Sequence, residues 1–362
     1  MLAARRTLTH KYAGNIDLPL LVPAFSSKGF KFEYSSKANK EKEYSEISFH
    51  LQHFLRPGME SVLVSAYDIH FNHLLNPNEN IKDIALLLKN AQYVFLDSGG
   101  YELGTDFDSA EVKSYQYHPK SDYGLKDYEL IIQKLTNSKK NLDLIISNYD
   151  FDPEGKSLSA QIDLARELFS TCPNSIKSFI IKPTKKSQKK KDKYIDPEGF
   201  AINDFKKLSS FDIIGVTEKE LGENIFDRMK NIAKIRRKLI EVDLDYPIHV
   251  WGGLDPVISA LYFFAGADIF DGISWLRYAY RKGIAINKNC NSILDPDYSV
   301  ATKDSINEGM TGSKNLEHLT NLKYALQEWV GYDGKKFHMF ESEIKDHLQR
   351  AYSKFKTGMK IR

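Results

Sequence analysis

The chain has 362 residues, 42% of them hydrophobic, and a formal net charge of +3. This is enough apolar material for one large domain with an appendage or for two domains, and the small net charge argues against nucleic-acid binding through a global basic field. The two cysteines, Cys172 and Cys290, are too few and too far apart for a disulfide framework or a zinc cluster, so we expect no bound metal.

Targeting signals are absent from the sequence. Residues 1–14 lack the continuous apolar core of a secretory signal, and no run approaches the ~20 apolar residues that span a bilayer. We therefore expect a cytoplasmic protein in a reducing setting, with no membrane partner.

Eight short apolar runs recur along the chain. Each is rich in Val, Ile or aromatic residues and is mostly apolar throughout rather than alternating, which is typical of strands buried on both faces of a parallel sheet. The runs cover residues 18–25, 61–66, 93–96, 144–147, 178–181, 212–216, 248–251 and 268–270.

Amphipathic stretches of helical length separate several of these runs, with apolar residues at positions i, i+3 and i+4. The clearest cover residues 79–91, 157–169, 224–242 and 256–267. Eight strands that alternate with helices favour an α/β fold, a (β/α)8 TIM barrel, over the competing doubly wound open sheet.

The chain changes character near residue 290, so we expect a barrel over residues 1–290 and a C-terminal helical appendage over 291–362. Within the appendage, residues 291–313 are polar and predict a loop. Two helices are predicted after it, over residues 315–330 and 341–355.

Carboxylates follow two of the predicted strands, Asp97 in FLDSGG and Asp271 in DIFDG. Active sites of this fold are built at the carboxyl ends of its strands. Two carboxylates facing each other there would suit glycosidic-bond chemistry, because one can attack the sugar carbon while the other manages the proton. The competing explanation for a strand-end aspartate is a helix N-cap.

Glycines mark three strand exits. Gly99 and Gly100 either let the backbone approach a planar ligand or simply make a tight turn, and the same holds for the glycines within 215–223 and 251–256. Neither of the latter segments matches a dinucleotide fingerprint or a P-loop, so we expect no nucleotide cofactor.

Basic residues follow two predicted strands. A lysine-rich run is usually a solvated loop, but at the carboxyl end of a barrel strand it lies on the active face, where it can contact phosphate. The candidates for such contacts are Arg277 and Arg281 after the last strand, and Lys185, Lys186, Lys189, Lys190 and Lys191 after the fifth.

Four segments together resemble the tRNA-guanine transglycosylase family. LDSGGYEL (96–103) looks like its DSGG-aromatic-Gln motif, and residues 211–223 align without gaps on its strand and GGLAVGE segment. IHVWGGLDP (248–256) resembles its MGVGTP segment, and DIFDGISWLRYAYRKG (268–283) resembles its DMFDCVLPTRxxRxG segment. Residues 18–25 also resemble the first strand of the family, so the resemblance covers the predicted barrel.

The resemblance implies a role for each matching residue. Asp271 matches the nucleophile and Asp97 the general acid and base. Asp150 matches the aspartate that accepts hydrogen bonds from the guanine edge, and Gly222 and Glu223 match a pair at the rim of the base pocket.

The same resemblance completes the expected site. Ser98, Gly99 and Gly100 of the DSGG motif would bind the base, and Arg277 and Arg281 match arginines that contact phosphate, the latter with a shift of one residue. Such chemistry requires no cofactor, because a carboxylate traps the sugar carbon directly.

The chain also departs from the family pattern. The C-terminal CxCxxC zinc site is absent, since only Cys290 lies in that region. Glu102 stands where the family has Gln, a second base-reading Gln falls near Lys182–Pro183, and the pocket loop becomes Thr217–Lys219. Ser274–Trp275 replaces Leu-Pro in the last motif. These changes indicate retained catalysis with altered base recognition, and the missing zinc module favours the DNA-modifying branch of the family.

We therefore expect an enzyme that replaces guanine in a polynucleotide, DNA in preference to tRNA, by a 7-deazaguanine such as preQ0 or preQ1 through a covalent sugar–aspartate intermediate. One alternative is a catalytically silent nucleic-acid-binding subunit of a transglycosylase complex. Another is a barrel hydrolase of a small nucleoside or glycoside. A homodimer and a complex with a partner subunit both remain open.

Overall fold

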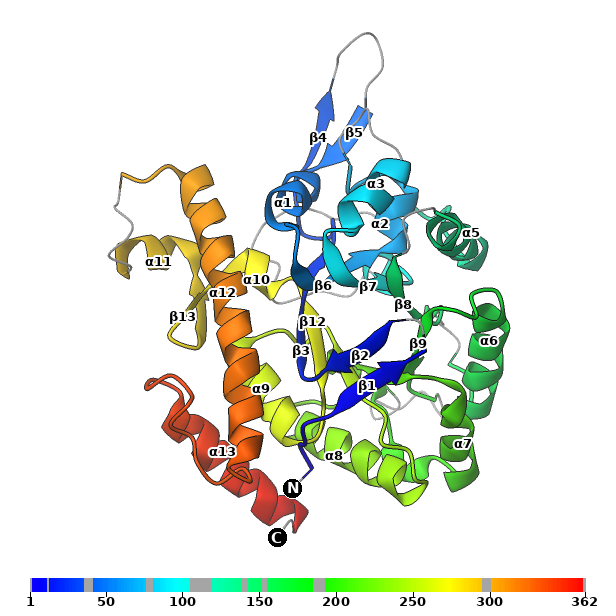
Figure 1. Ribbon diagram of the computed structural model, residues 1–362, viewed down its shortest axis with the longest axis vertical. Coiled ribbons are helices and arrows are strands. Elements are labelled where there is room, and N and C mark those ends of the chain that lie inside the picture. Colours follow the sequence, from blue (N-terminus) through cyan, green and yellow to red (C-terminus); the bar gives the residue numbers. More distant parts are fainter. Residues whose placement is uncertain are drawn as a thin grey trace. The chain divides into compact units, whose positions relative to one another are not determined.

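A computed structural model of the chain describes residues 2–11, 13–35, 42–75, 81–104, 119–138, 142–151, 155–184, 193–294 and 301–360. Its central feature is a closed barrel of eight parallel strands surrounded by helices (Figure 1). In their order around the barrel, the strands are β10 (Ile213–Thr217), β11 (Ile248–Trp251), β12 (Ile269–Gly272), β3 (Leu20–Phe25), β6 (Met59–Ser65), β7 (Ala91–Asp97), β8 (Asp143–Ser147) and β9 (Ile176–Ile181).

Each barrel strand overlaps one of the eight apolar runs, so the predicted TIM barrel is confirmed. Every residue of β3, β11 and β12 is buried, because a barrel strand contacts interior side chains on one face and helices on the other. Among the described residues, three two-stranded sheets lie outside the barrel: β1 (Thr7–His10) with β2 (Gly14–Asp17), β4 (Phe32–Ser35) with β5 (Lys42–Ser45), and β13 (Tyr278–Arg281) with β14 (Ile284–Asn287).

The four predicted barrel helices are confirmed as α3 (Ile81–Leu88), α6 (Leu158–Ser170), α8 (Ile225–Glu241) and α9 (Pro256–Phe264). Local capping explains where α9 begins, because the Asp255 side chain accepts the backbone N–H groups of Val257 and Ile258. The other helices before residue 290 are α1 (Ile47–Phe54), α2 (Ala66–His70), α4 (Gly100–Leu103), α5 (Leu125–Thr136), α7 (Ile202–Lys207), α10 (Ser274–Arg277) and the start of α11 (Lys288–Leu294).

The C-terminal region contains the long helix α12 (Asp304–Gly331) and α13 (Lys345–Met359), which confirms a helical C-terminal region. The predicted loop over 291–313 is wrong for residues 291–294 and 304–313, which belong to α11 and α12, whereas residues 301–303 are not helical and 295–300 lie outside the described residues. The boundary of the barrel at residue 290 stays a prediction, and α11 runs across it.

The first part of α12 was missed because its buried face is polar. Asn307, Thr311 and Asn315 recur every four residues and are all buried. The Asn315 amide donates to the carbonyl oxygens of Trp275 (2.6 Å) and Tyr278 (2.8 Å). A search for apolar periodicity cannot find a helix whose packing depends on buried hydrogen bonds.

The C-terminal helices pack through aromatic side chains. Trp329 of α12 is fully buried, with its ring centroid 4.2 Å from that of Phe264 on α9 and 5.1 Å from that of Tyr352 on α13. Large aromatic rings bury the most apolar area per residue, so this cluster attaches α12 and α13 to α9.

The chain divides into two compact units. The first comprises Met1–Pro23, Glu154–Ile162 and Ile180–Arg362, and the second comprises Ala24–Pro153 and Asp163–Phe179. The candidate residues are divided between them, with Asp271, Gly222, Glu223, Arg277 and Arg281 in the first and the DSGG segment with Asp150 in the second.

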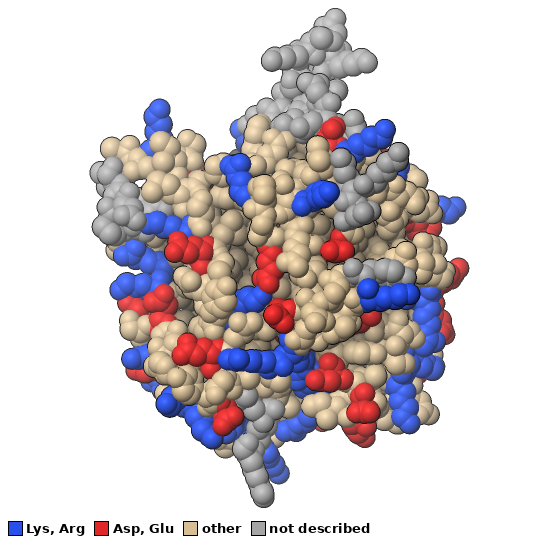
Figure 2. All heavy atoms as spheres, viewed as in Figure 1, with Lys and Arg blue, Asp and Glu red and all other residues tan. Residues whose placement is uncertain are grey.

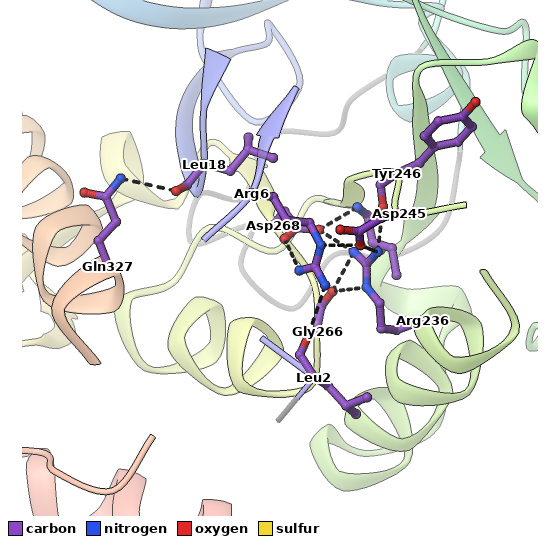
Figure 3. A network of polar contacts seen from close by, with 10 residues as sticks. Leu2, Arg6, Leu18, Arg236, Asp245, Tyr246, Gly266, Asp268 and Gln327 are labelled. Atoms are coloured by element: carbon purple, nitrogen blue, oxygen red, sulfur yellow. Dashed lines mark hydrogen bonds and ion pairs between the residues drawn. The ribbon is translucent and has the colours of Figure 1, made fainter. Parts of the chain in front are cut away.

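A buried network of charges lies in the first unit (Figure 3). Asp268 is fully buried and accepts hydrogen bonds from Arg6 (2.9 Å), from Arg236 and from the backbone N–H of Ile248 (2.9 Å). Asp245 contacts the same two arginines but has a side chain that is 70% exposed. The network ties the N-terminal segment to α8 and to the segment that precedes β12.

Candidate active site

Asp271 is the centre of the site in the first unit. It lies on β12, is 5% exposed, and accepts two hydrogen bonds at the same oxygen, Oδ1. The donors are Nε2 of His249 at 2.9 Å and the backbone N–H of Gly252 at 3.2 Å. The other oxygen, Oδ2, accepts no hydrogen bond from the residues that the structure describes. One oxygen is therefore held while the second is available to react.

His249 was missed in the sequence, although it contacts the predicted nucleophile. It lies on β11, is fully buried, and stacks on Trp251 with ring centroids 4.2 Å apart. Burial lowers the pKa of His249 below its usual value, although Asp271 acts in the opposite direction. An ionised carboxylate can only accept a hydrogen bond, so Nε2 carries the proton in this pair.

Gly215 makes room for this arrangement. It pairs with His249 across β10 and β11, and a Cβ at position 215 would lie 2.6 Å from Nε1 of Trp251. A side chain at 215 would displace the indole on which His249 stacks. Neither explanation proposed for these glycines, approach to a planar ligand or a tight turn, accounts for Gly215, which lies within β10 and packs against Trp251.

The second unit brings together the residues of the DSGG segment and Asp150. Asp97 ends β7 and is half-buried, and its Oδ2 accepts the backbone N–H of Gly99 at 3.0 Å. The hydroxyl of Ser98, which is fully buried, donates to Oδ1 of Asp150 at 2.6 Å. The hydrogen bond from Ser98 thus joins the segment after β7 to Asp150, which follows β8, and the role of these residues in base binding stays a prediction.

Both glycines of the segment are required by their surroundings. Gly99 has a φ of +96°, and a Cβ there would lie 2.7 Å from Cβ of Tyr67. A Cβ at Gly100 would lie 2.7 Å from Oδ1 of Asp150. The tight turn therefore occurs at Gly99, while the backbone at Gly100 lies against the Asp150 carboxylate, and the approach of a planar ligand stays a prediction.

Glu102 lies on α4, directly after this segment, and is 1% exposed. Its carboxylate contacts the hydroxyl groups of Ser26 and Ser65. Burial, followed by the charge of Asp68, raises the pKa of Glu102 to about 7, while the two serine hydroxyls act in the opposite direction. Glu102 thus links α4 to Ser26, directly after β3, and to Ser65, at the end of β6.

We expect Glu102→Gln to change how stability depends on pH. The raised pKa means that the folded protein holds this proton while the unfolded chain releases it, so the free energy of unfolding falls as pH rises from about 4.5 to 7. The loss from this one group is about 3 kcal/mol. Glutamine does not ionise, so the Glu102→Gln variant should not show this loss of stability as pH rises.

Urea unfolding at pH 5 and pH 8 tests this expectation. The variant should match the wild type at pH 5 and exceed it at pH 8, whereas Glu60→Gln, at an exposed position, should leave the wild-type pH dependence intact. A wild-type pH dependence in Glu102→Gln would show that this carboxyl is not the group responsible.

The predicted rim residues lie in the first unit. Gly222 has a φ of +156°, and its carbonyl oxygen accepts a hydrogen bond from Nε of Arg228 at 3.1 Å. Glu223 is exposed. Arg228 also pairs with Glu218 at 2.8 Å, so the turn after β10 is tied to α8.

A second ion pair involves the same turn after β10. Lys182 lies 2.8 Å from Glu220, and Tyr262 donates to Glu218 at 2.8 Å. Burial raises the pKa of Glu218, and Arg228 opposes this shift. Nζ of Lys182 also donates to Oγ1 of Thr217 at 3.4 Å, so Lys182, directly after β9, contacts the end of β10.

The predicted phosphate contacts differ in their surroundings. Arg277 is half-buried at the end of α10. Arg281, at the end of β13, donates to the carbonyl oxygen of Leu294 at 2.5 Å. The five candidate lysines, Lys185, Lys186, Lys189, Lys190 and Lys191, lie outside the described residues.

Comparisons with known proteins do not assign the chain to a family. No known protein family matches it, and no curated protein is significantly similar. Within the described ranges, no group of three or more His, Cys, Asp or Glu side chains could hold a metal ion. The described helices include none that is long and apolar enough to cross a membrane.

Proposed function

We propose that the protein is a base-exchange transglycosylase that replaces guanine in a polynucleotide, DNA in preference to tRNA, by a 7-deazaguanine. The observation that carries the proposal is the geometry of Asp271, which is held through Oδ1 and keeps Oδ2 available at the end of a barrel strand. Active sites of this fold lie at that end of the strands. The resemblance of four segments to the tRNA-guanine transglycosylases supplies the reaction class.

In the proposed first step, Oδ2 of Asp271 attacks C1′ of the target nucleotide. The C1′–N9 bond breaks, guanine takes a proton as it leaves, and the sugar becomes covalently bound to Asp271. The resemblance, rather than the structure, assigns the donation of this proton to Asp97. The target base has to leave its stack to reach such a site, so a flipped or single-stranded nucleotide is favoured.

In the second step, the incoming 7-deazaguanine gives its proton to Asp97, which is now ionised. Its nitrogen attacks C1′ and the Asp271 carboxylate leaves, so two displacements retain the configuration of the sugar. Asp150 is assigned to the guanine edge, where its carboxylate would accept hydrogen bonds, and the hydroxyl of Ser98 fixes Oδ1 of that carboxylate.

Exchange of labelled guanine tests the proposal. Purified protein is incubated with single-stranded DNA, duplex DNA and tRNA that contain radiolabelled guanine, with and without a 7-deazaguanine. The proposal expects release of label that depends on the added base. Release that does not depend on it would identify a hydrolase instead, and binding without release would identify a silent subunit.

Polynucleotide binding is expected to rely on local cationic side chains, because acidic and basic residues are interspersed on the face drawn in Figure 2. We expect Arg277→Ala to weaken binding and to lower the slope of log affinity against log salt by about 1, as the loss of one phosphate contact does. Fluorescence anisotropy across a range of salt concentrations measures this slope.

Arg237→Ala is the matched control, since Arg237 is exposed on α8 and donates to the carbonyl oxygen of Met359. Its slope should equal that of the wild type. Equal slopes for both variants would remove Arg277 from the phosphate-binding set, and tight binding to tRNA alone would reverse the preference for DNA.

A further inference from the structure

We propose that His249 is a positioning residue that determines which oxygen of Asp271 attacks the sugar. This inference rests on the proposed function and assigns a role in it to His249, a residue to which the sequence analysis gave none. It is drawn from the hydrogen bonds, burial and packing around Asp271.

Two donors hold one oxygen of the nucleophile. Rotation of a carboxylate about its last bond exchanges its two oxygens, and a single donor leaves the tilt of the group undetermined. His249 and the Gly252 N–H both donate to Oδ1, one from a side chain and one from the backbone after β11. Together they fix the plane of the carboxylate and direct Oδ2 away from the donors.

The imidazole is itself held in place. It is fully buried, stacks on Trp251, and lies on a strand whose register with β12 pairs His249 with Ile269. Trp251 packs in turn against Gly215, where no side chain fits. The donor therefore reaches Oδ1 from a rigid support rather than from a mobile loop.

A neutral donor suits a nucleophile better than a charged one. An imidazolium would form an ion pair with Asp271 and stabilise the carboxylate that has to react. Burial in a low-dielectric interior opposes that charge and keeps the ring neutral. A hydrogen bond without net charge orients the carboxylate at a smaller cost in reactivity.

The test compares two replacements at position 249. His249→Gln keeps an N–H donor on a flexible side chain, and His249→Phe keeps an aromatic ring beside Trp251 but has no donor. Single-turnover formation of the covalent adduct is followed by quenching and denaturing gel electrophoresis with a labelled oligonucleotide. Dissociation constants and thermal unfolding are measured in parallel.

We expect His249→Phe to form the adduct about 10²-fold more slowly, because a misplaced reacting group costs about this much, with a dissociation constant within about twofold of wild type. His249→Gln should recover most of the rate. If His249→Phe does not fold, His249→Met replaces it, since methionine is flexible and has no N–H donor.

Two results would overturn this inference and leave the proposed function standing. The first is adduct formation by His249→Phe at the wild-type rate. The second is equally slow adduct formation by the Gln and Phe variants, with parallel losses of thermal stability. The second would mean that the imidazole only supports the fold. Absence of both adduct and exchange in the wild-type protein would instead overturn the proposed function, and this inference with it.

Discussion

Asp271→Asn is expected to reduce base exchange by about 10⁴-fold or more and to eliminate the covalent adduct, with little effect on folding. The amide oxygen of asparagine can accept the same two hydrogen bonds, from His249 and from the Gly252 N–H, so the packing of β12 is kept. The amide is not a nucleophile, so no bond to C1′ forms. Release of labelled guanine from the polynucleotide measures the effect.

Asp255→Asn is the matched control. Asp255 follows β11 in the same unit and caps α9, and asparagine is an equally good N-cap. Exchange by this variant should be close to wild type. Exchange by Asp271→Asn at a near wild-type rate would remove Asp271 from the role of nucleophile.

Asp268→Ala is expected to lower the free energy of unfolding by about 3–5 kcal/mol, the usual cost of removing one partner from a buried ion pair. The variant leaves the guanidinium group of Arg236, whose side chain is fully buried, without its strongest partner. It also removes the acceptor of Arg6 and of the Ile248 N–H. Chemical denaturation measures the loss.

Asp245→Ala controls for the loss of a carboxylate near the same arginines. Its side chain is 70% exposed, and exposed ion pairs contribute at most about 1 kcal/mol. The loss in the free energy of unfolding should therefore be several-fold larger for Asp268→Ala than for Asp245→Ala. Equal losses would show that the burial of Asp268 does not set the strength of the network (Figure 3).

The barrel could be predicted from the sequence because parallel strands buried on both faces give continuous apolar runs. β3 and β12 are examples, since all their residues are buried. The same logic failed at the start of α12, where the buried face consists of Asn307, Thr311 and Asn315. Hydrogen bonds rather than apolar contacts position that face, and they leave no hydrophobic period in the sequence.

Sequence analysis identified the candidate residues that lie at the ends of predicted strands. The grouping of Asp97, Ser98 and Asp150 follows from neighbouring parallel strands, because β7 and β8 pair directly. His249 could not be found in this way. It lies within a buried strand, 22 residues before Asp271, and its contact depends on the register of β11 with β12.

The central claim is base exchange in a polynucleotide, and mass spectrometry of nucleosides tests it most directly. DNA and tRNA are isolated from cells with the protein, without it, and with Asp271→Asn in its place, and are digested to nucleosides. The account predicts a 7-deazaguanine nucleoside in the DNA of cells that contain the wild-type protein and in neither of the other two. Absence of any such nucleoside from both DNA and tRNA of cells that contain the wild-type protein and are supplied with the base would contradict it.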